Sequence, residues 1–248
     1  MNGAFNVDGD AYDDFMGRYS RLLAVRFADF AGVEEGMRAL DVGAGTGALT
    51  AELVARGASV AAADPSPEFV AAFRKRFPEV EVHEAPAEDM PFESGAFDVA
   101  LAQLVVAFVS DAPAAVTEMA RVARRVAVCM WGVEEVDMFA AIDRTAEAVG
   151  ASRAAEPRRF RTPREIHDLL APLGDVESAE LDVTAGYRDF DEFWQAMNRG
   201  VGPAGQWVAS LGPEQREHAR KELSRELGSP QGPFELHTRA FAAVVTPA

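Results

Sequence analysis

The chain has 248 residues, 48% of them apolar, and a formal net charge of −16 at pH 7, a length that suits one large domain or a domain with an insertion. The negative charge argues against nucleic acid and anionic membranes as partners, because both require a basic surface, and no apolar run approaches a membrane span. A single cysteine, Cys129, excludes an internal disulfide framework, and residues 1–8 lack the basic start and apolar core of a secretory signal. We therefore expect a cytoplasmic protein, monomer or homodimer, whose partner is a small molecule.

Residues 10–30 carry apolar side chains near helical spacing, which predicts a helix with an interruption at Gly17. Two interpretations stay open for this helix. Either it packs on the surface of the domain, or residues 1–35 are a lid that folds over a bound ligand.

Residues 40–50 predict a short buried strand, a glycine-rich turn and the first turn of a helix. Glycines at Gly43, Gly45 and Gly47 let the backbone adopt conformations barred to other residues and let a ligand lie against it. The following helix directs its free N–H groups and positive dipole end at this turn. Together these features form a seat for a nucleotide-like or carboxylate-bearing ligand, and Asp41 adds a hydrogen-bond acceptor beside it.

Strand-like runs at residues 59–64 and 80–83 flank an amphipathic stretch at 68–77, and this alternation predicts a parallel, doubly wound sheet. Asp64 ends the second strand about 20 positions after the turn, which also fits a dinucleotide-binding pattern. Asp41 favours a different cofactor, because a carboxylate at that point would repel a pyrophosphate.

The string from Asp41 to Gly47, Asp-Val-Gly-Ala-Gly-Thr-Gly, resembles the first motif of class I S-adenosylmethionine-dependent methyltransferases. Further segments follow in the family's order: an adenine-site-like stretch at 85–92, a buried strand at 97–102 and a strand at 126–131. The family's usual Pro-Gly-Gly before that last strand is missing. The resemblance covers about residues 10–131 and is closest to the small-molecule branch of ubiquinone and menaquinone biosynthesis.

This resemblance implies S-adenosyl-L-methionine as the cofactor and assigns roles by motif. Asp64 would bind the ribose diol, Ala87 and Glu88 the adenine, Arg18 the carboxylate of the cofactor and Tyr12 its methionyl part. The full set expected at the cofactor is Asp41, Gly43, Ala44, Gly45, Asp64, Pro65, Ala87, Glu88, Gln103, Leu104, Tyr12 and Arg18.

The acceptor side of the site is expected to be apolar. Where family members often carry polar or histidine residues, this chain has Phe108. Trp131 either faces the same pocket or lies in the plain core, and Trp194 from a later helix is the third residue expected at the pocket. Gln103 is the one polar group expected near the transferred methyl, and no catalytic base is assigned. The four histidines form no ligand spacing, so no metal site is expected.

The second half predicts helices at 135–149 and from Pro163 onward, and strands at 176–183 and 234–245. Residues 187–228 between those strands are rich in aromatics and predict a helical cap over the acceptor site, with a dimer contact as the alternative. The expected fold is an α/β, doubly wound, Rossmann-like sheet of seven mostly parallel strands with an antiparallel last strand, built from residues 36–186 and 229–248.

The predicted function is S-adenosylmethionine-dependent methyl transfer to a small, largely apolar acceptor through O, N or C. The reaction would be an in-line displacement in which the protein aligns the partners and excludes water. The alternatives are an NAD(P)-dependent reductase and an S-adenosylmethionine-binding protein without catalysis.

Overall fold

The computed structural model describes residues 9–151, 159–200 and 202–247, without the side chains of residues 9–15, 133–137, 202 and 203. The elements, in chain order, are α1 (Gly9–Phe30), β1 (Arg38–Val42), α2 (Ala48–Ala55), β2 (Ser59–Asp64), α3 (Pro67–Arg76), β3 (Glu81–Glu84), β4 (Val99–Gln103), α4 (Ala112–Val122), β5 (Val126–Val136), α5 (Asp137–Ala148), α6 (Pro163–Leu170), the 3-10 turn η2 (Ala171–Leu173), β6 (Val176–Tyr187), α7 (Phe190–Asn198), α8 (Gly202–Ser210), α9 (Pro213–Glu226) and β7 (Phe234–Val245).

The strands form one seven-stranded sheet in the order β3-β2-β1-β4-β5-β7-β6. The strands from β3 to β5 pair in parallel, and β7 runs antiparallel to both of its neighbours, β5 and β6. This arrangement confirms the predicted fold class. The order reverses between β1 and β4, and open α/β sheets bind ligands at the carboxyl ends of the strands beside such a point.

Both faces of the sheet are covered, and alternate residues of β5 show how the two cores separate. Ala127, Cys129 and Trp131 belong to one hydrophobic cluster, with α1 and α2. Their neighbours Val126, Val128 and Met130 belong to the second, with α4 and α6. This division follows from the strand geometry, which directs successive side chains to opposite faces.

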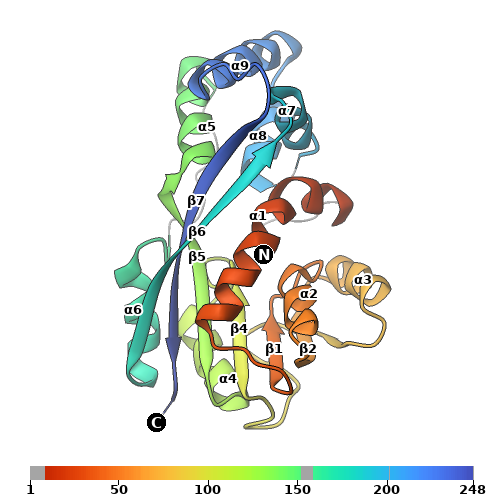
Figure 1. Ribbon diagram of the computed structural model, residues 1–248, viewed down its shortest axis with the longest axis vertical. Coiled ribbons are helices and arrows are strands. Elements are labelled where there is room, and N and C mark those ends of the chain that lie inside the picture. Colours follow the sequence, from red (N-terminus) through yellow and green to blue (C-terminus); the bar gives the residue numbers. More distant parts are fainter. Residues whose placement is uncertain (1–8, 152–158, 201, 248) are drawn as a thin grey trace.

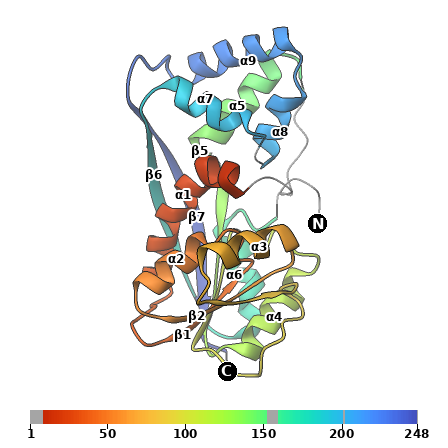
Figure 2. The same ribbon diagram turned by 90° about the vertical axis from the view of Figure 1, so that its right-hand side faces the viewer.

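The helices lie in two tiers (Figures 1 and 2). The lower tier, α2, α3, α4 and α6, flanks the sheet, the upper tier lies above it, and α1 lies between the two. The long strands β5, β6 and β7 reach upward into the upper tier, which consists of α5, α7, α8 and α9. The strand β6 extends to Tyr187 rather than residue 183 because its inward positions stay buried at Ala185 and Tyr187.

The upper tier also contains a helix that lies outside the predicted cap of residues 187–228. Helix α5 packs against α9, and Arg144 forms an ion pair with Glu226 across these two helices. The long β strands carry the chain away from the lower tier, so helices distant in sequence become neighbours there.

Local capping fixes where several helices begin. Thr162 caps α6: its hydroxyl accepts from the Glu165 N–H at 3.2 Å, and the Glu165 carboxylate accepts from the Thr162 N–H at 3.1 Å. Pro163 occupies the first helical position, as the sequence predicts. A cap of this kind stabilises a helix by about 1 kcal/mol.

Candidate ligand site at the glycine turn

The turn between β1 and α2 requires glycine at more than one position. Gly43 and Gly47 have φ values of 69° and 87°, in the left-handed region that other residues avoid. A Cβ atom at Gly43 would lie 2.6 Å from a methyl of Val105, and one at Gly47 would lie 2.3 Å from the ring of Phe77. The backbone of the turn is therefore held closely against its neighbours.

Asp64 holds this turn from the end of β2. Its Oδ2 accepts from the Gly45 N–H at 2.8 Å, and its Oδ1 accepts from the Ser66 N–H at 2.9 Å. The side chain is buried, and burial raises its pKa against the lowering effect of those two bonds. Each carboxylate oxygen can accept a second hydrogen bond, so both remain able to bind a ligand hydroxyl.

Asp41, the last but one residue of β1, is the most deeply buried carboxylate near the turn. It is 1% exposed and accepts from the Thr50 hydroxyl at 2.6 Å. Burial raises its pKa to about 7, opposed by the Thr50 hydrogen bonds and assisted slightly by the charge of Asp64. A cationic group beside Asp41 would favour the ionised carboxylate, because an opposite charge lowers a carboxyl pKa.

A cavity of about 50 Å³ lies at the turn, under α1. It is lined by Ser20, Asp41, Gly43, Ala44, Gly45, Thr46, Ala48, Leu49, Gln103 and Leu104. Complete ligand pockets measure about 300 Å³ or more, so this cavity would hold only the part of a ligand beside the turn. Six of its residues belong to the predicted cofactor set, and four do not.

The residues that the sequence reasoning missed are Ser20, Thr46, Ala48 and Leu49. The last three lie inside or directly after the glycine motif, so their place next to it was the available signal. Ser20 had no such signal, because the residues that α1 turns toward the sheet depend on how the helix packs.

The carboxyl end of β4 meets α1 directly above the turn. The Gln103 side-chain amide donates to the Ser20 carbonyl at 3.0 Å, and the Leu104 N–H donates to the Cys129 carbonyl at 2.9 Å. Leu104 has a φ of 63°, a left-handed conformation that costs a non-glycine residue about 1–3 kcal/mol and that clusters at functional sites. The chain is therefore bent sharply where it borders the cavity.

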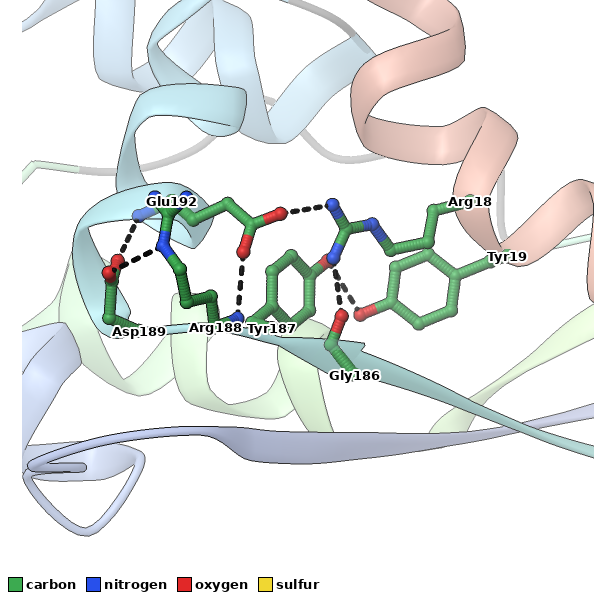
Figure 3. Close-up of polar contacts among 7 residues, drawn as sticks. All are labelled: Arg18, Tyr19, Gly186, Tyr187, Arg188, Asp189 and Glu192. Carbon is green, nitrogen blue, oxygen red and sulfur yellow. Dashed lines mark hydrogen bonds and ion pairs between the residues drawn. The ribbon is translucent and has the colours of Figure 1, made fainter.

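Arg18 occupies a different place from the one that the resemblance implied. Figure 3 shows its guanidinium at the junction of β6 and α7, where it forms an ion pair with Glu192 and donates to the Gly186 carbonyl. It also lies 4.4 Å from the centre of the Tyr187 ring. Arg18 precedes Ser20 by two positions, and such residues lie on nearly opposite faces of a helix. When Ser20 lines the cavity, Arg18 consequently points away from it.

A pair of buried tyrosines joins the same two elements. The Tyr187 hydroxyl donates to the Tyr19 hydroxyl at 2.9 Å (Figure 3). Burial raises the pKa of Tyr187 to about 12, so this hydroxyl stays protonated at neutral pH. Side chains of α1 are thus bonded to the end of β6 and the start of α7, at the lower side of the upper tier. Tyr12, the other predicted lid contact, has its side chain outside the described part of the structure.

The residues predicted for the adenine lie in the loop after β3. Ala87 is buried. The Glu88 carboxylate accepts from the Ser110 N–H at 2.8 Å and the Asp111 N–H at 3.0 Å, so it holds the loop that leads into α4. Neither residue lines the cavity at the turn, and their adenine role stays a prediction. Pro65 follows Asp64 directly and is half-buried.

The prediction that Phe108 and Trp131 face one pocket is wrong. Trp131 and Trp194 belong to the cluster on the α1 face of the sheet, whereas Phe108 packs against the cluster on the opposite face. The reason is the bend at Leu104, after which the chain crosses to the α4 side. Trp131 and Trp194 are both 7% exposed, and Trp194 stacks on Phe190 within the upper tier.

Two further expectations concern reactive side chains. Cys129 is fully buried, and burial raises the pKa of its thiol far above the usual value, so it is a core thiol rather than a nucleophile. Within residues 9–151, 159–200 and 202–247, no group of three or more histidine, cysteine or acidic side chains is arranged to bind a metal ion. No helix in that same part of the chain is long and apolar enough to cross a membrane.

The sheet order, the glycine turn and the acidic residue that ends β2 define an α/β protein of the doubly wound class, with its site at the carboxyl ends of the strands. Residues 40–130 match the family described as a methyltransferase domain. The match confirms the resemblance that the motifs predicted.

Curated relatives match over the same region. The chain is 40% identical over 87 residues to an uncharacterized methyltransferase of Mycobacterium tuberculosis, a match that covers 35% of each chain. It is 36% identical over 96 residues to the demethylmenaquinone methyltransferase of Beutenbergia cavernae, covering 39% of this chain and 40% of that one. The chain thus spans about a third of the length of the first of these relatives.

Solved structures share the fold over most of the chain. A putative methyltransferase from an antibiotic biosynthesis pathway of Anabaena variabilis superposes with a TM-score of 0.64 at 18% identity, covering 88% of this chain and 95% of that one. The phosphoethanolamine N-methyltransferase 2 of Haemonchus contortus, solved with phosphomonomethylethanolamine and S-adenosylhomocysteine, gives 0.58 at 17% identity, covering 97% and 57%. At these identities the likeness establishes the fold.

Proposed function

We propose that this protein transfers a methyl group from S-adenosylmethionine to a small organic acceptor. The observation that carries the proposal is the pair of buried carboxylates, Asp41 and Asp64, on either side of the glycine turn. A pyrophosphate would meet electrostatic repulsion from Asp41. A ligand with an ammonium group and a ribose diol suits both carboxylates, and the methyltransferase family of residues 40–130 agrees with it.

Each residue of the site has a role in this proposal. The ligand lies against the backbone of the glycine turn and the N-terminal end of α2, Asp64 accepts from the ribose hydroxyls, and Asp41 balances the cationic end of the cofactor. Ala87 and Glu88 border the adenine. A structural neighbour holds S-adenosylhomocysteine, which supports the choice of cofactor. Helix α1 acts as the lid, and the helices of residues 187–228, within the upper tier, cover the acceptor.

The bound cofactor supplies a methyl group on a positively charged sulfur, which is already activated for attack. The protein therefore needs mainly to align the acceptor and to exclude water. Trp131 and Trp194 line the α1 face where the acceptor would lie. The acceptor atom attacks in line with the bond from sulfur to methyl, and the leaving thioether is neutral.

Calorimetric titration with S-adenosylhomocysteine, S-adenosylmethionine and NAD tests the choice of cofactor. We expect micromolar binding of the first two, and about tenfold or greater weakening in an Asp64→Ala variant, since a hydrogen bond to a charged group contributes about 1.5–3 kcal/mol. Asp182→Ala is the control, because that carboxylate binds Arg239 at the far edge of the sheet. Binding of NAD alone would favour the reductase. Tight binding of S-adenosylmethionine without turnover on any acceptor would favour a non-catalytic protein.

A further inference from the structure

Four buried polar atoms on the α1 face of the sheet have no hydrogen-bond partner among the described residues. They are Ser20 Oγ, Gln103 Oε1, Trp131 Nε1 and Thr238 Oγ1. Buried polar groups in folded proteins nearly always have partners, so each exception calls for an explanation such as a missing ligand. We call these four residues the polar row.

The sheet register places the residues of the polar row one after another on the same face of the sheet, in a line that runs from β4 across β5 to β7. The Gln103 amide contacts the Ser20 carbonyl, and Gln103 lies opposite Cys129 in the pairing of β4 with β5. Trp131 is two residues further along β5 on the same face, opposite Ala240 of β7. Thr238 is the next residue of β7 on that face, toward the upper tier, because β7 runs antiparallel to β5. The row thus leads from the cavity at the turn toward the upper tier.

The chemistry of the row is specific. Trp131 Nε1 can only donate and Gln103 Oε1 can only accept, whereas the two hydroxyls of Ser20 and Thr238 can do either. None of the four side chains carries a charge. The nearby charged groups have other partners, since Asp41 faces the cationic end of the cofactor in the proposed function and Arg18 pairs with Glu192. The row therefore suits an uncharged molecule that carries both a hydrogen-bond donor and an acceptor.

We propose that the polar row binds the methyl acceptor, and that this acceptor is a neutral molecule with a hydroxyl or amine to be methylated and a carbonyl-type oxygen elsewhere. This inference rests on the proposed function and narrows its substrate class. The nucleophile donates to Gln103 Oε1, and the carbonyl oxygen accepts from Trp131 and Thr238. In the transfer, a lone pair of the acceptor atom forms the new bond to methyl, the bond from sulfur to methyl breaks, its electron pair stays on sulfur, and the acceptor proton passes to water.

The first test is made without any acceptor, by thermal unfolding of Trp131→Phe and Thr238→Val. Each substitution removes an unpartnered polar atom, so little or no loss of Tm is expected. The matched controls are Trp207→Phe and Thr145→Val, because Trp207 donates to the Ala151 carbonyl at 3.0 Å and Thr145 to the Ala141 carbonyl at 2.7 Å. Both controls lose a buried hydrogen bond and should lower the Tm more than their counterparts in the row. Equal losses would overturn the proposal, since they would mean that the row is bonded within the protein.

The second test is binding of three probes to the protein saturated with S-adenosylhomocysteine, measured by ligand-observed NMR. The probes are 4-hydroxyacetophenone, which is neutral with both groups, phenol, which lacks the carbonyl, and 4-hydroxybenzoate, which is charged. We expect 4-hydroxyacetophenone to bind about fivefold or more tightly than the other two, the value of one hydrogen bond. Trp131→Phe and Thr238→Val should each remove that preference, and Thr238→Val, which lies further from the glycine turn, should leave the affinity for S-adenosylhomocysteine unchanged.

The outcomes separate the two proposals. If S-adenosylhomocysteine binds but the wild type shows no preference for 4-hydroxyacetophenone, or the variants retain it, the polar row is not the acceptor site. If S-adenosylhomocysteine itself does not bind, the proposed function fails, whatever the probes do.

Discussion

The buried carboxyl of Asp41 makes the stability of the ligand-free protein depend on pH in a defined direction. Its pKa is about 7 in the folded protein, against the ordinary 3.8. Because the folded value is the higher one, the stability that this group contributes is complete below about pH 4 and is lost as the pH rises through 7. Between pH 5 and pH 8 the loss amounts to about 2.5 kcal/mol for a shift of this size.

Asp41→Asn removes the titration and keeps an oxygen that can accept from the Thr50 hydroxyl. Urea unfolding of both proteins at pH 5, 6, 7 and 8 gives the difference between them, which cancels the titration of all other groups. We expect wild type to lose about 2.5 kcal/mol more than the variant over this range. Asp98→Asn is the control, because hydrogen bonding to the Arg38 N–H lowers the pKa of that half-buried carboxyl, which therefore stays ionised from pH 5 to pH 8, so the substitution should leave the slope of the stability curve unchanged. Parallel stability curves for wild type and Asp41→Asn would refute the reasoning.

Three further predictions follow from the same geometry. If a cationic ligand binds only the protein with ionised Asp41, calorimetry should show S-adenosylhomocysteine affinity rising about tenfold from pH 6 to pH 8 in wild type and staying flat in Asp41→Asn. Gly47→Ala should destabilise the protein by about 2–5 kcal/mol in the same urea assay, since it combines a left-handed backbone with overpacking against Phe77. Gly36→Ala is the control: it has a left-handed backbone but open space around it, so it should cost only about 1–2 kcal/mol. Glu192→Gln removes the partner of Arg18 and should change the free energy of unfolding by less than about 1 kcal/mol, but it should speed proteolytic cleavage within α1. The control is Glu222→Gln, which removes an ion pair inside α9. Equal cleavage rates for the two variants would contradict the role of the Arg18–Glu192 ion pair in attaching α1 to α7.

The parts of the site that depend on local sequence were predictable. The glycine turn, the position of Asp64 at the end of β2 and the start of a helix at Pro163 each depend on a few consecutive residues, and the structure has them where the sequence indicates. The sheet order follows from the alternation of strands and helices.

The remaining features depend on packing between distant elements. The direction of Arg18 is set by the face of α1 that meets the sheet, and the side taken by Phe108 is set by the backbone bend at Leu104. The spacing of residues in the sequence predicts neither the direction of Arg18 nor the face of the sheet on which Phe108 lies. Likewise, α5 joins the upper tier because β5 runs on to Val136, five residues beyond the predicted end at Trp131.

A crystal structure of the protein with S-adenosylhomocysteine tests the central claim most directly. The expected complex has the ligand against the glycine turn, with its ribose hydroxyls on Asp64, its ammonium near Asp41 and its sulfur directed toward Gln103 and Trp131. A ligand bound at another surface, or at the turn with its ribose away from Asp64, would contradict the claim.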